Sequence, residues 1–350
     1  MVSQRTLPVN LASAEGTLFE HERVKEIPDH QLLPFQDKMM VTPDGVLYRR
    51  GALVSASLYN TSHRDFYEGT YQWYYSCRSW FERNNPGPYL LAFDAWSLGY
   101  FHWMTEFIPR LFMSRALIPE CTVILPAVSN GIWNKPAAHR SLFKTPVSPS
   151  GAEYMTGSLA PFHLTRVYRH TARVPLITSQ LYFSTHLAPS GNYNDDVMRS
   201  IRNFYVESYV NVRERPNRLI YVSRRLASRR FVENEKAVID MLRSHGFEIH
   251  TLETMTFADQ VRLLSQTRLL VGQHGAALTN LLFMQEGTAV LELKTAGDSQ
   301  NLCYFSLASA LQVKYLYQFC DGDGRSVQDA NIVVDLALLE KNIMLAVSIS

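Results

Sequence analysis

Residues 271–283 read VGQHGAALTNLLF and mark a change from strand to helix. The apolar run TRLLVG that leads into them is typical of a buried strand, and AALTNLLF after them is apolar enough for a buried helix. Gly272 and Gly275 stand between the two and remove side chains where the chain turns. A helix that begins after a strand directs free backbone N–H groups outward, so this stretch predicts an anion-binding turn.

The same alternation of strand and helix runs through the second half of the chain. From about Arg218, the apolar runs RLIYVS, FEIHTL, TRLLVG, AVLELK and VKYLYQF alternate with ENEKAVIDMLRSHG, TFADQVRLLSQ, AALTNLLF and NLCYFSLASALQ. This order predicts a parallel sheet with helices on both faces. Local signals agree, because Thr256 can cap the helix that follows it and Gly246 lies just past the end of another.

The first half of the chain is less regular and is rich in Tyr, Trp, Pro and Gly. Its strand candidates are VLYRRGALVSAS, YLLAFD and TVILPA, and the helix candidate FHWMTEFIPRLFMSR separates the last two. Prolines interrupt residues 136–161, which predicts loops there. At least one strand-helix-strand unit is therefore expected in this half as well.

The length favours two domains, because 350 residues exceed what one hydrophobic core usually organises. We expect an α/β protein in which residues 1–205 form the first lobe and residues 206–330 form the second. The segment NDDVMRSIRNFYVESYVNVR is the predicted linking helix. The last helix, within residues 331–350, is expected to pack back on the first lobe.

The composition is that of a folded protein without a strong overall charge. Hydrophobic residues make up 46% of the chain, charged residues make up 19%, and the formal net charge is +2. So small a charge predicts no general attraction to nucleic acid. The four cysteines are widely spaced, which favours reduced thiols over disulfides or a zinc site. Neither a run of 18 apolar residues nor a basic leader is present, so we expect a cytoplasmic protein.

Four arginines follow the first strand of the predicted parallel sheet. The segment YVSRRLASRRF places Arg224, Arg225, Arg229 and Arg230 in the loop that leaves this strand. Guanidinium groups match phosphate oxygens bidentately and stay charged at neutral pH, so a diphosphate is a natural partner. A solvated basic turn or a nonspecific polyanion patch is the alternative. If the strands are neighbours, the arginines and the helix after His274 converge on one pocket.

His274 and Glu292 are further polar candidates at the same edge of the sheet. An imidazole between the two glycines can donate a hydrogen bond to phosphate, although a tight turn alone would also explain the glycines. Glu292 ends the strand AVLELK, where a carboxylate can accept hydrogen bonds from ribose hydroxyls. A solvent-facing strand end is the alternative for Glu292.

In the first half, His102 and Glu106 lie four residues apart in the helix candidate. On a helix they share one face, where the carboxylate can orient the imidazole or either group can act as a base. The alternative is a histidine satisfied by the backbone and an exposed helical carboxylate. No third ligand stands nearby in the sequence, so a metal is not predicted. Tyr100, Phe101 and Trp103 either line a sugar-binding surface or belong to the core.

Taken together, these stretches resemble glycosyltransferase family 61. That family shows a Tyr-x-Ser-Arg segment, a following Arg with Asn-Glu, and an HGA-x-Leu-x-Asn-x-x-Phe block. This chain has the matching residues at 221–224, at Arg230 with 234–235, and at 274–283. The likeness covers about residues 217–293, with a weaker echo at 100–103. The combined pattern is specific, although each piece alone is not.

The resemblance implies a GT-B type fold, with two Rossmann-like lobes and a cleft between them, and inverting transfer without a bound metal. It implies a nucleotide-diphosphate sugar as donor, with UDP as the expected nucleotide, and a hydroxyl of a glycan or glycolipid as acceptor. On this interpretation Arg224 and Arg230 hold the diphosphate, and His274 with the backbone amides of Gly275 and Ala276 completes the site.

The resemblance also extends the set of candidate residues. Ser223, Asn234 and Asn280 belong to the matching motifs and join Glu292 in the predicted donor site, while His102 and Glu106 would face the reacting sugar. Animal and plant members carry an Asp near the position of Glu106, so the base is either Glu106 or His102. A bacterial, cytoplasmic member is expected, free or peripherally attached to the membrane. The alternative function is a nucleotide-sugar-binding protein without catalysis.

Overall fold

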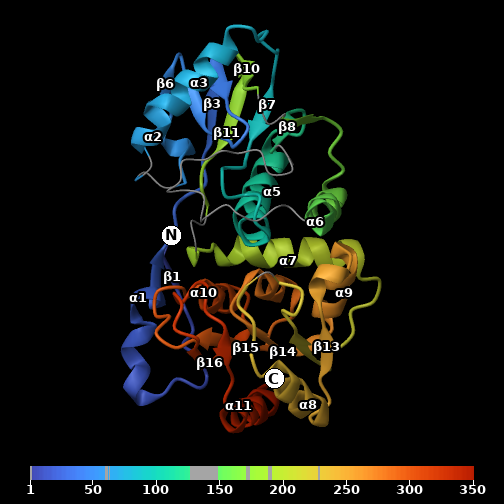
Figure 1. The fold of residues 1–350 in the computed structure, drawn as a ribbon. Coiled ribbons are helices and arrows are strands. Elements are labelled where there is room, and N and C mark those ends of the chain that lie inside the picture. Colours follow the sequence, from blue (N-terminus) through green and yellow to red (C-terminus); the bar gives the residue numbers. More distant parts are fainter. Residues whose placement is uncertain are drawn as a thin grey trace. The chain divides into compact units, whose positions relative to one another are not determined.

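The chain folds into two compact units in a computed structural model that describes residues 2–59, 62, 64–126, 149–170, 174–187, 191–227 and 229–350 (Figure 1). One unit combines Met1–Ile27 with Ser190–Ser350, and the other is Pro28–Pro189. Residues 136–148 of the predicted loop region lie outside the described residues. In the part of the chain that is described, no helix has the length and apolar character needed to cross a bilayer.

The unit that contains the C-terminus is built on a six-stranded sheet in the order β13-β12-β14-β15-β16-β17. Neighbouring strands are parallel, apart from the antiparallel pair β16 and β17. The strands run over Arg218–Val222 (β12), Glu248–His250 (β13), Thr267–Gln273 (β14), Ala289–Thr295 (β15), Lys314–Gly322 (β16) and Ile332–Val333 (β17). The prediction of a parallel sheet in the second half of the chain is confirmed.

Helices cover both faces of this sheet (Figure 1). The helices α8 and α11 contribute to one core cluster with the strands, and α7, α9, η9 and α10 pack together on the opposite face. Their bounds are Asp195–Tyr209 (α7), Glu235–Ser244 (α8), Leu252–Thr254 (η8), Phe257–Ser265 (α9), Ala276–Phe283 (η9, a 3-10 helix), Cys303–Ala310 (α10) and Leu336–Ile349 (α11).

The helix signals read from the sequence have the expected geometry. The Thr256 side chain accepts a hydrogen bond from the Asp259 backbone N–H at 3.2 Å, which caps α9. Gly246 follows α8 with φ +81°, a conformation that glycine adopts without a steric penalty. Val238 and Leu242 lie one turn apart on the buried face of α8. These local patterns therefore position the helices as predicted.

The division of the chain differs from the predicted one at both ends. Residues 1–27 belong to the unit with the six-stranded sheet. They carry β1 (Val2–Gln4), η1 (Ser13–Leu18), α1 (Glu20–Arg23) and β2 (Val24–Glu26). Phe19 explains this placement, because it is fully buried with its ring centroid 4.8 Å from that of Phe305 and 5.1 Å from that of Tyr317.

The C-terminal helix also differs from the expectation. Instead of packing on the predicted first lobe, α11 contacts β15 and β16 and buries Leu339, Ile343 and Ala346 in the core of that sheet. The boundary near residue 205 moves to 190, because the predicted linking helix is α7, which packs against α9, η9 and α10. Both differences follow from apolar faces that find partners far away in the sequence.

The other unit contains a five-stranded sheet in the order β3-β11-β7-β8-β9, parallel except for β3, and an antiparallel sheet in the order β10-β4-β5-β6. The strands are Leu32–Phe35 (β3), Met39–Val41 (β4), Leu47–Arg49 (β5), Ala52–Leu53 (β6), Tyr89–Leu91 (β7), Thr122–Leu125 (β8), Val167–Arg169 (β9), Leu176–Thr178 (β10) and Leu181–Ser184 (β11). β7 and β8 confirm the predicted strand-helix-strand unit. The single strand predicted within residues 46–57 is instead the hairpin β5–β6, since Arg50 and Gly51 both adopt positive φ and turn the chain.

The helices of this unit include the one predicted between β7 and β8. It runs as α4 (Tyr100–His102), the π-helix η4 (Trp103–Phe107) and α5 (Ile108–Leu117). π-Helical turns are rare and frequently occur at functional sites. The remaining helices are Ser55–Ser57 (η2), Arg64–Glu68 (α2), Thr70–Ser79 (α3), Pro149–Leu159 (α6) and Ala160–Phe162 (η6).

Candidate functional site

The carboxyl ends of β12 and β14 bring the main donor-site candidates together. The two strands are neighbours, and Val222 is in register with Gly272. A Cβ added to Gly275 would overlap Arg224 Nη1 and would lie 3.6 Å from Arg230 Nη2. The two guanidinium groups therefore meet at the first turn of η9. We call Arg224, Arg230, Gly275 and Ala276 the arginine cradle.

Arg224 is a buried cation that forms no ion pair within the described residues. Its Nε donates to the Arg230 carbonyl at 3.1 Å, and its Nη2 donates to the Arg229 carbonyl at 3.2 Å. Burial, together with the neighbouring charge of Arg230, lowers the pKa of Arg224 to about 10. A buried charge is unfavourable unless it is paired, so this guanidinium is well placed to bind an anion.

Arg230 shares this character and adds an unusual backbone conformation. Its φ is +60°, which is uncommon for a residue other than glycine and recurs at functional sites. Its Nε is buried and has no hydrogen-bond partner among the described residues. Burial also lowers the pKa of Arg230. In contrast, Arg229 pairs with Asp329 and Arg225 is exposed, so only two of the four arginines face the cradle.

The first turn of η9 supplies the remaining part of the cradle. The first N–H groups of a helix have no partner within the helix, and here they start at Gly275 and Ala276, beside the two guanidinium groups. Backbone amides and fixed positive charge at one helix terminus form a ready anion site. The absence of a side chain at Gly275 is required, because a Cβ would occupy the space of the Arg224 guanidinium.

Glu292 is fully buried on β15 and binds His274. One carboxylate oxygen is hydrogen-bonded to His274 Nδ1, and the other accepts a hydrogen bond from the Tyr315 hydroxyl at 2.6 Å. Burial raises the pKa of Glu292, but Lys294, His274 and the Tyr315 hydroxyl lower it, and the net result is a lowered pKa. The solvent-facing alternative for Glu292 is therefore wrong, and both of its oxygens contact protein groups.

His274 is held from three sides. Its Nδ1 contacts Glu292, its Nε2 lies 3.0 Å from Asn301 Nδ2, and its ring centroid is 5.2 Å from that of Tyr304. The Tyr304 hydroxyl in turn donates to the Gly275 carbonyl at 2.7 Å. The imidazole is thereby fixed next to the arginine cradle.

Three other residues predicted for the sugar-donor site form hydrogen bonds with the protein backbone. The Ser223 hydroxyl accepts a hydrogen bond from the backbone N–H two residues later at 3.2 Å. Asn234 donates to the Val334 carbonyl at 2.8 Å and accepts from the Val334 N–H at 3.0 Å. Asn280 is buried, and its amide donates to a carbonyl of η9 at 3.1 Å. These side chains shape the loop and the helix around the cradle.

In the unit Pro28–Pro189, a half-buried His102 and a buried Glu106 form a pair where α4 meets η4. His102 Nδ1 lies 3.0 Å from Glu106 Oε1, and the Tyr59 hydroxyl donates to the same oxygen at 3.3 Å. Glu106 is 1% exposed, so the alternative of an exposed helical carboxylate is wrong. Burial lowers the pKa of His102, but Glu106 and Asp94 raise it more, and the net result is above its ordinary value of 6.5.

A second polar cluster in this unit was not predicted from the sequence. It consists of Asp94, Arg110 and His186. Asp94 follows β7, and its Oδ2 lies 3.2 Å from Arg110 Nη1 and 3.7 Å from His186 Nδ1. Burial lowers the pKa of Arg110 to about 10, and burial with the charge of Arg110 lowers that of His186 to about 4. The missed signal was a polar residue shortly after the end of a strand, in FDAWSLG and again in LYFSTH.

The aromatic residues around His102 divide into a core group and a site group. Trp103 is 1% exposed and packs on Phe107 with ring centroids 4.1 Å apart, so both belong to the core. The Tyr59 ring centroid lies 5.4 Å from that of Trp96 and 5.6 Å from that of His102. The ring centroids of Phe101 and Trp96 lie 5.1 Å and 5.3 Å from that of His102. Phe101, Trp96 and Tyr59 are therefore aromatic neighbours of the His102–Glu106 pair.

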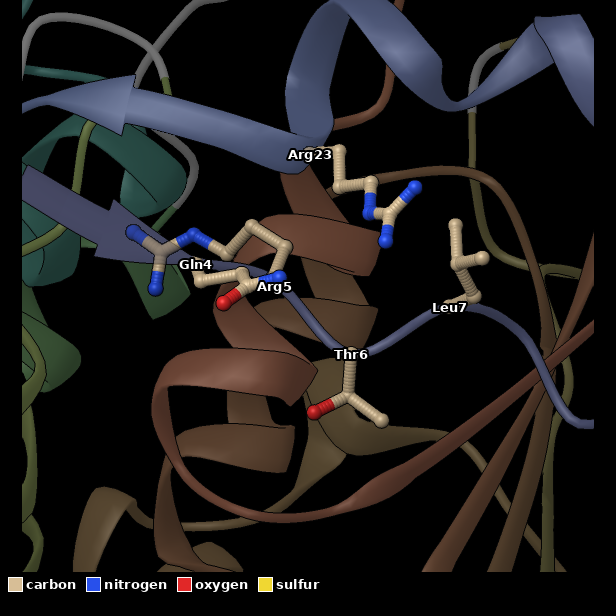
Figure 2. A pocket seen from close by; sticks show the side chains of 5 residues that line it. All are labelled: Gln4, Arg5, Thr6, Leu7 and Arg23. Carbon is tan, nitrogen blue, oxygen red and sulfur yellow. The ribbon is translucent and has the colours of Figure 1, made fainter.

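A pocket of about 350 Å³ is formed by other residues (Figure 2). It is lined by Gln4, Arg5, Thr6, Leu7 and Arg23, none of which belongs to the cradle. Figure 2 shows the Arg5 guanidinium turned away from Arg23, and this group pairs with Asp195 and donates to the Tyr193 carbonyl at 2.7 Å. Arg5 is thus already neutralised. Across the described residues, no group of three His, Cys, Asp or Glu side chains is arranged to hold a metal.

A family model described as Glycosyltransferase 61 matches residues 100–291, more than half of the chain. The chain belongs to glycosyltransferase family 61. The family predicted from the motifs is confirmed, and the matched region contains both the His102–Glu106 pair and the arginine cradle.

Curated relatives are similar in sequence to part of this chain. The EGF domain-specific O-linked N-acetylglucosamine transferase of Bos taurus is 28% identical over 151 residues, 41% of this chain and 28% of that protein. The Drosophila melanogaster protein of the same name is 25% identical over 147 residues, with the same two shares. The xylan glycosyltransferase MUCI21 of Arabidopsis thaliana is 28% identical over 120 residues, 30% of this chain and 24% of that protein. The match thus spans about a quarter of the length of these relatives.

Proposed function

We propose that this family 61 member is an inverting glycosyltransferase of the GT-B type that transfers a sugar from a nucleotide-diphosphate sugar to a hydroxyl of a glycan or glycolipid. The expected nucleotide is UDP, and no bound metal is required. One observation carries the proposal: Arg224 and Arg230 converge on the first turn of η9, and within the described residues neither forms an ion pair with a carboxylate. The presence of a parallel sheet in each unit supports the fold type.

The diphosphate is the part of the donor that the cradle suits best. Two guanidinium groups offer several N–H donors in a planar arrangement that matches phosphate oxygens, and the amides at the start of η9 add further donors. Arg224 is buried and Arg230 is half-buried, and reduced contact with water strengthens the interaction of a charge with an anion. Arg225, Arg229 and the low net charge argue against a nonspecific polyanion patch, because the exposed arginines are not the ones that converge.

The acceptor hydroxyl is proposed to lose its proton to the His102–Glu106 pair. Either Glu106 accepts the proton directly, or His102 accepts it while Glu106 holds the imidazole. The oxygen then attacks the anomeric carbon of the donor as the bond from that carbon to the diphosphate breaks. A single displacement of this kind inverts the anomeric centre.

The leaving diphosphate gains negative charge, and Arg224, Arg230 and the η9 amides are proposed to stabilise it. Such groups are already in place before the reaction, and preorganised electrostatic stabilisation of this kind usually contributes more to catalysis than any other single effect. Fixed positive charge would here take the role that a divalent metal takes in other enzymes.

For the acceptor and the cellular location, we propose a class and not a specific molecule. The relatives are named as an N-acetylglucosamine transferase specific for EGF domains and as a xylan glycosyltransferase, so the family spans protein and glycan acceptors. For this chain we propose a glycan or glycolipid acceptor, no nucleic-acid partner, and a cytoplasmic location, either free or peripherally attached to the membrane.

The test is an assay of nucleoside diphosphate release from a panel of nucleotide sugars, with and without acceptor glycans and with and without EDTA. We expect turnover with one donor, unaffected by chelator, and a product whose anomeric configuration is inverted in its NMR spectrum. Nucleotide binding without turnover across the whole panel would instead favour the non-catalytic nucleotide-sugar-binding alternative. Loss of turnover in EDTA would contradict metal independence.

A further inference from the structure

Both ring nitrogens of His274 contact protein groups, which leaves no N–H group to offer an anion in this arrangement. The Asn301 side-chain nitrogen is a donor and lies 3.0 Å from His274 Nε2, so Nε2 accepts this hydrogen bond. The imidazole proton therefore sits on Nδ1 and is donated to Glu292. A phosphate oxygen can bind at Nε2 only after the Asn301 amide leaves and Nε2 gains a proton.

Glu292 is built to stabilise that extra proton. Its carboxylate is fully buried, stays charged because its pKa is lowered, and contacts His274 Nδ1 directly. The Tyr315 hydroxyl holds the second carboxylate oxygen at 2.6 Å, which keeps the first one aligned with the imidazole. A buried carboxylate in direct contact favours the charged form of an imidazole.

The imidazole is also next to the anion site. His274 directly precedes Gly275, and Tyr304 contacts both, with its ring against the imidazole and its hydroxyl on the Gly275 carbonyl. Tyr304 is also close enough to Arg224 and Arg230 to influence the pKa of both, so a diphosphate in the arginine cradle would lie near the imidazole.

Positive and negative groups both surround His274, and a bound diphosphate would change the balance between them. Glu292 and Tyr304 contact the imidazole directly. The groups around this contact are Lys294, Tyr315 and Cys303 beside Glu292, Asp298 beside Lys294, and Arg224 and Arg230 beside Gly275. Arg224, Arg230 and Lys294 are the positive charges among these groups. A bound diphosphate neutralises the arginines, and Glu292 is then the dominant neighbour.

We propose that His274 and Glu292 form one proton-binding unit, in which a diphosphate displaces the Asn301 amide and Nε2 takes up one proton from solvent. This inference rests on the proposed function. The Nδ1–H bond to Glu292 is kept, and the new Nε2–H donates to a phosphate oxygen. In turnover the bond from the anomeric carbon to the diphosphate breaks, and the imidazolium offsets one negative charge on the leaving group. The proton returns to solvent when the nucleotide dissociates.

The experiment is isothermal titration calorimetry of UDP at about pH 7.5, where the phosphates are almost fully ionised, in buffers of different ionisation enthalpy. Wild-type protein should take up a substantial fraction of one proton per UDP bound. Glu292→Gln keeps the shape of the side chain but removes its charge, so proton uptake should fall and affinity should drop roughly tenfold to a hundredfold. His274→Asn should abolish the uptake assigned to the imidazole.

Glu340→Gln is the matched control, because it removes the carboxylate from another Glu–His pair of the same unit, 3.0 Å from His245. It should bind UDP like the wild type. Equal proton uptake in wild-type, Glu292→Gln and His274→Asn protein would overturn the inference while leaving the proposed function intact. If Glu292→Gln fails to fold, as judged by circular dichroism, the comparison of wild type with His274→Asn decides alone. Failure of the wild type to bind any nucleoside diphosphate would instead contradict the proposed function.

Discussion

Arg224 and Arg229 lie in one loop, yet their guanidinium groups have opposite surroundings. Arg229 pairs with Asp329 at the surface, where an ion pair contributes little to stability. Arg224 is buried against Gly275 and has only backbone carbonyls as hydrogen-bond acceptors within the described residues. The difference shows which arginine of YVSRRLASRRF is available to a ligand, and it depends on contacts that the spacing of the arginines does not reveal.

Gly275→Ala tests this close approach. The added Cβ would overlap the terminal nitrogen of Arg224, a flexible end that can move, so the fold should survive while the cradle is displaced. We expect UDP affinity to fall about tenfold or more, in line with the loss of one charged hydrogen bond. The thermal unfolding midpoint should also fall, because φ +159° at this position disfavours any residue with a side chain. Gly16→Ala, whose Cβ would meet nothing within 4 Å, is the control. Unchanged UDP binding by Gly275→Ala would contradict the position assigned to Arg224.

The His102–Glu106 pair predicts a specific dependence of activity on pH. Because the pKa of His102 is raised above 6.5, kcat/KM should fall as the pH drops through a midpoint above 6.5. If His102 is the base, Glu106→Gln should shift this midpoint downward, since the carboxylate that raises the pKa is gone and burial lowers it. If Glu106 is the base, the same variant should lose activity at every pH. A pH profile unchanged by Glu106→Gln would exclude both roles.

At the scale of elements, the parallel sheet explains why distant residues meet. Arg224 follows β12 and Gly275 follows β14, and parallel neighbours end at the same edge. These strands were predictable because each is a continuous apolar run flanked by a helix with recognisable ends, such as Thr256 and Gly246. The hairpin of β5 and β6 was not predictable from the sequence. Its turn requires Arg50 in a left-handed conformation, which is uncommon for a residue other than glycine.

Contacts between residues far apart in the sequence were also not predictable. The assignment of residues 1–27 depends on Phe19 burying its ring against Phe305, and a single aromatic residue leaves no periodic pattern. The buried state of Glu292 depends on Tyr315 and His274, which come from a neighbouring strand and from the end of another. The candidate residues were thus predictable by type and place, whereas their contacts required the fold.

Two histidines at the ends of parallel strands predict a loss of stability in acid. His170 follows β9 and His186 follows β11, and burial lowers the pKa of each to about 4, against an ordinary 6.5. Between these pH values the unfolded chain binds more protons than the folded one, so stability falls as the pH drops from 6.5 to 4. The unfolding midpoint should decrease over this window and less steeply in His170→Asn. His21→Asn, at an exposed site, should follow the wild type. An identical slope in all three proteins would contradict the assignment to His170.

At the scale of the whole molecule, the two candidate sites lie in different units, each with its own parallel sheet. The arginine cradle belongs to the unit that ends with α11, and the His102–Glu106 pair belongs to Pro28–Pro189. The family match includes both, which fits a donor site and an acid–base site in one enzyme. The central claim is that the cradle binds the diphosphate of the donor without a metal.

The most direct measurement of that claim is calorimetric titration of UDP, in EDTA, into wild-type, Arg224→Ala and Arg229→Ala protein. The two variants remove the same charge from one loop, but only Arg224 faces Gly275. We predict that Arg229→Ala binds UDP like the wild type, and that Arg224→Ala loses about tenfold to a hundredfold in affinity, as expected for one charged hydrogen-bonding group. Equal affinity of the Arg224→Ala and wild-type proteins, or a requirement for a divalent cation, would contradict the account.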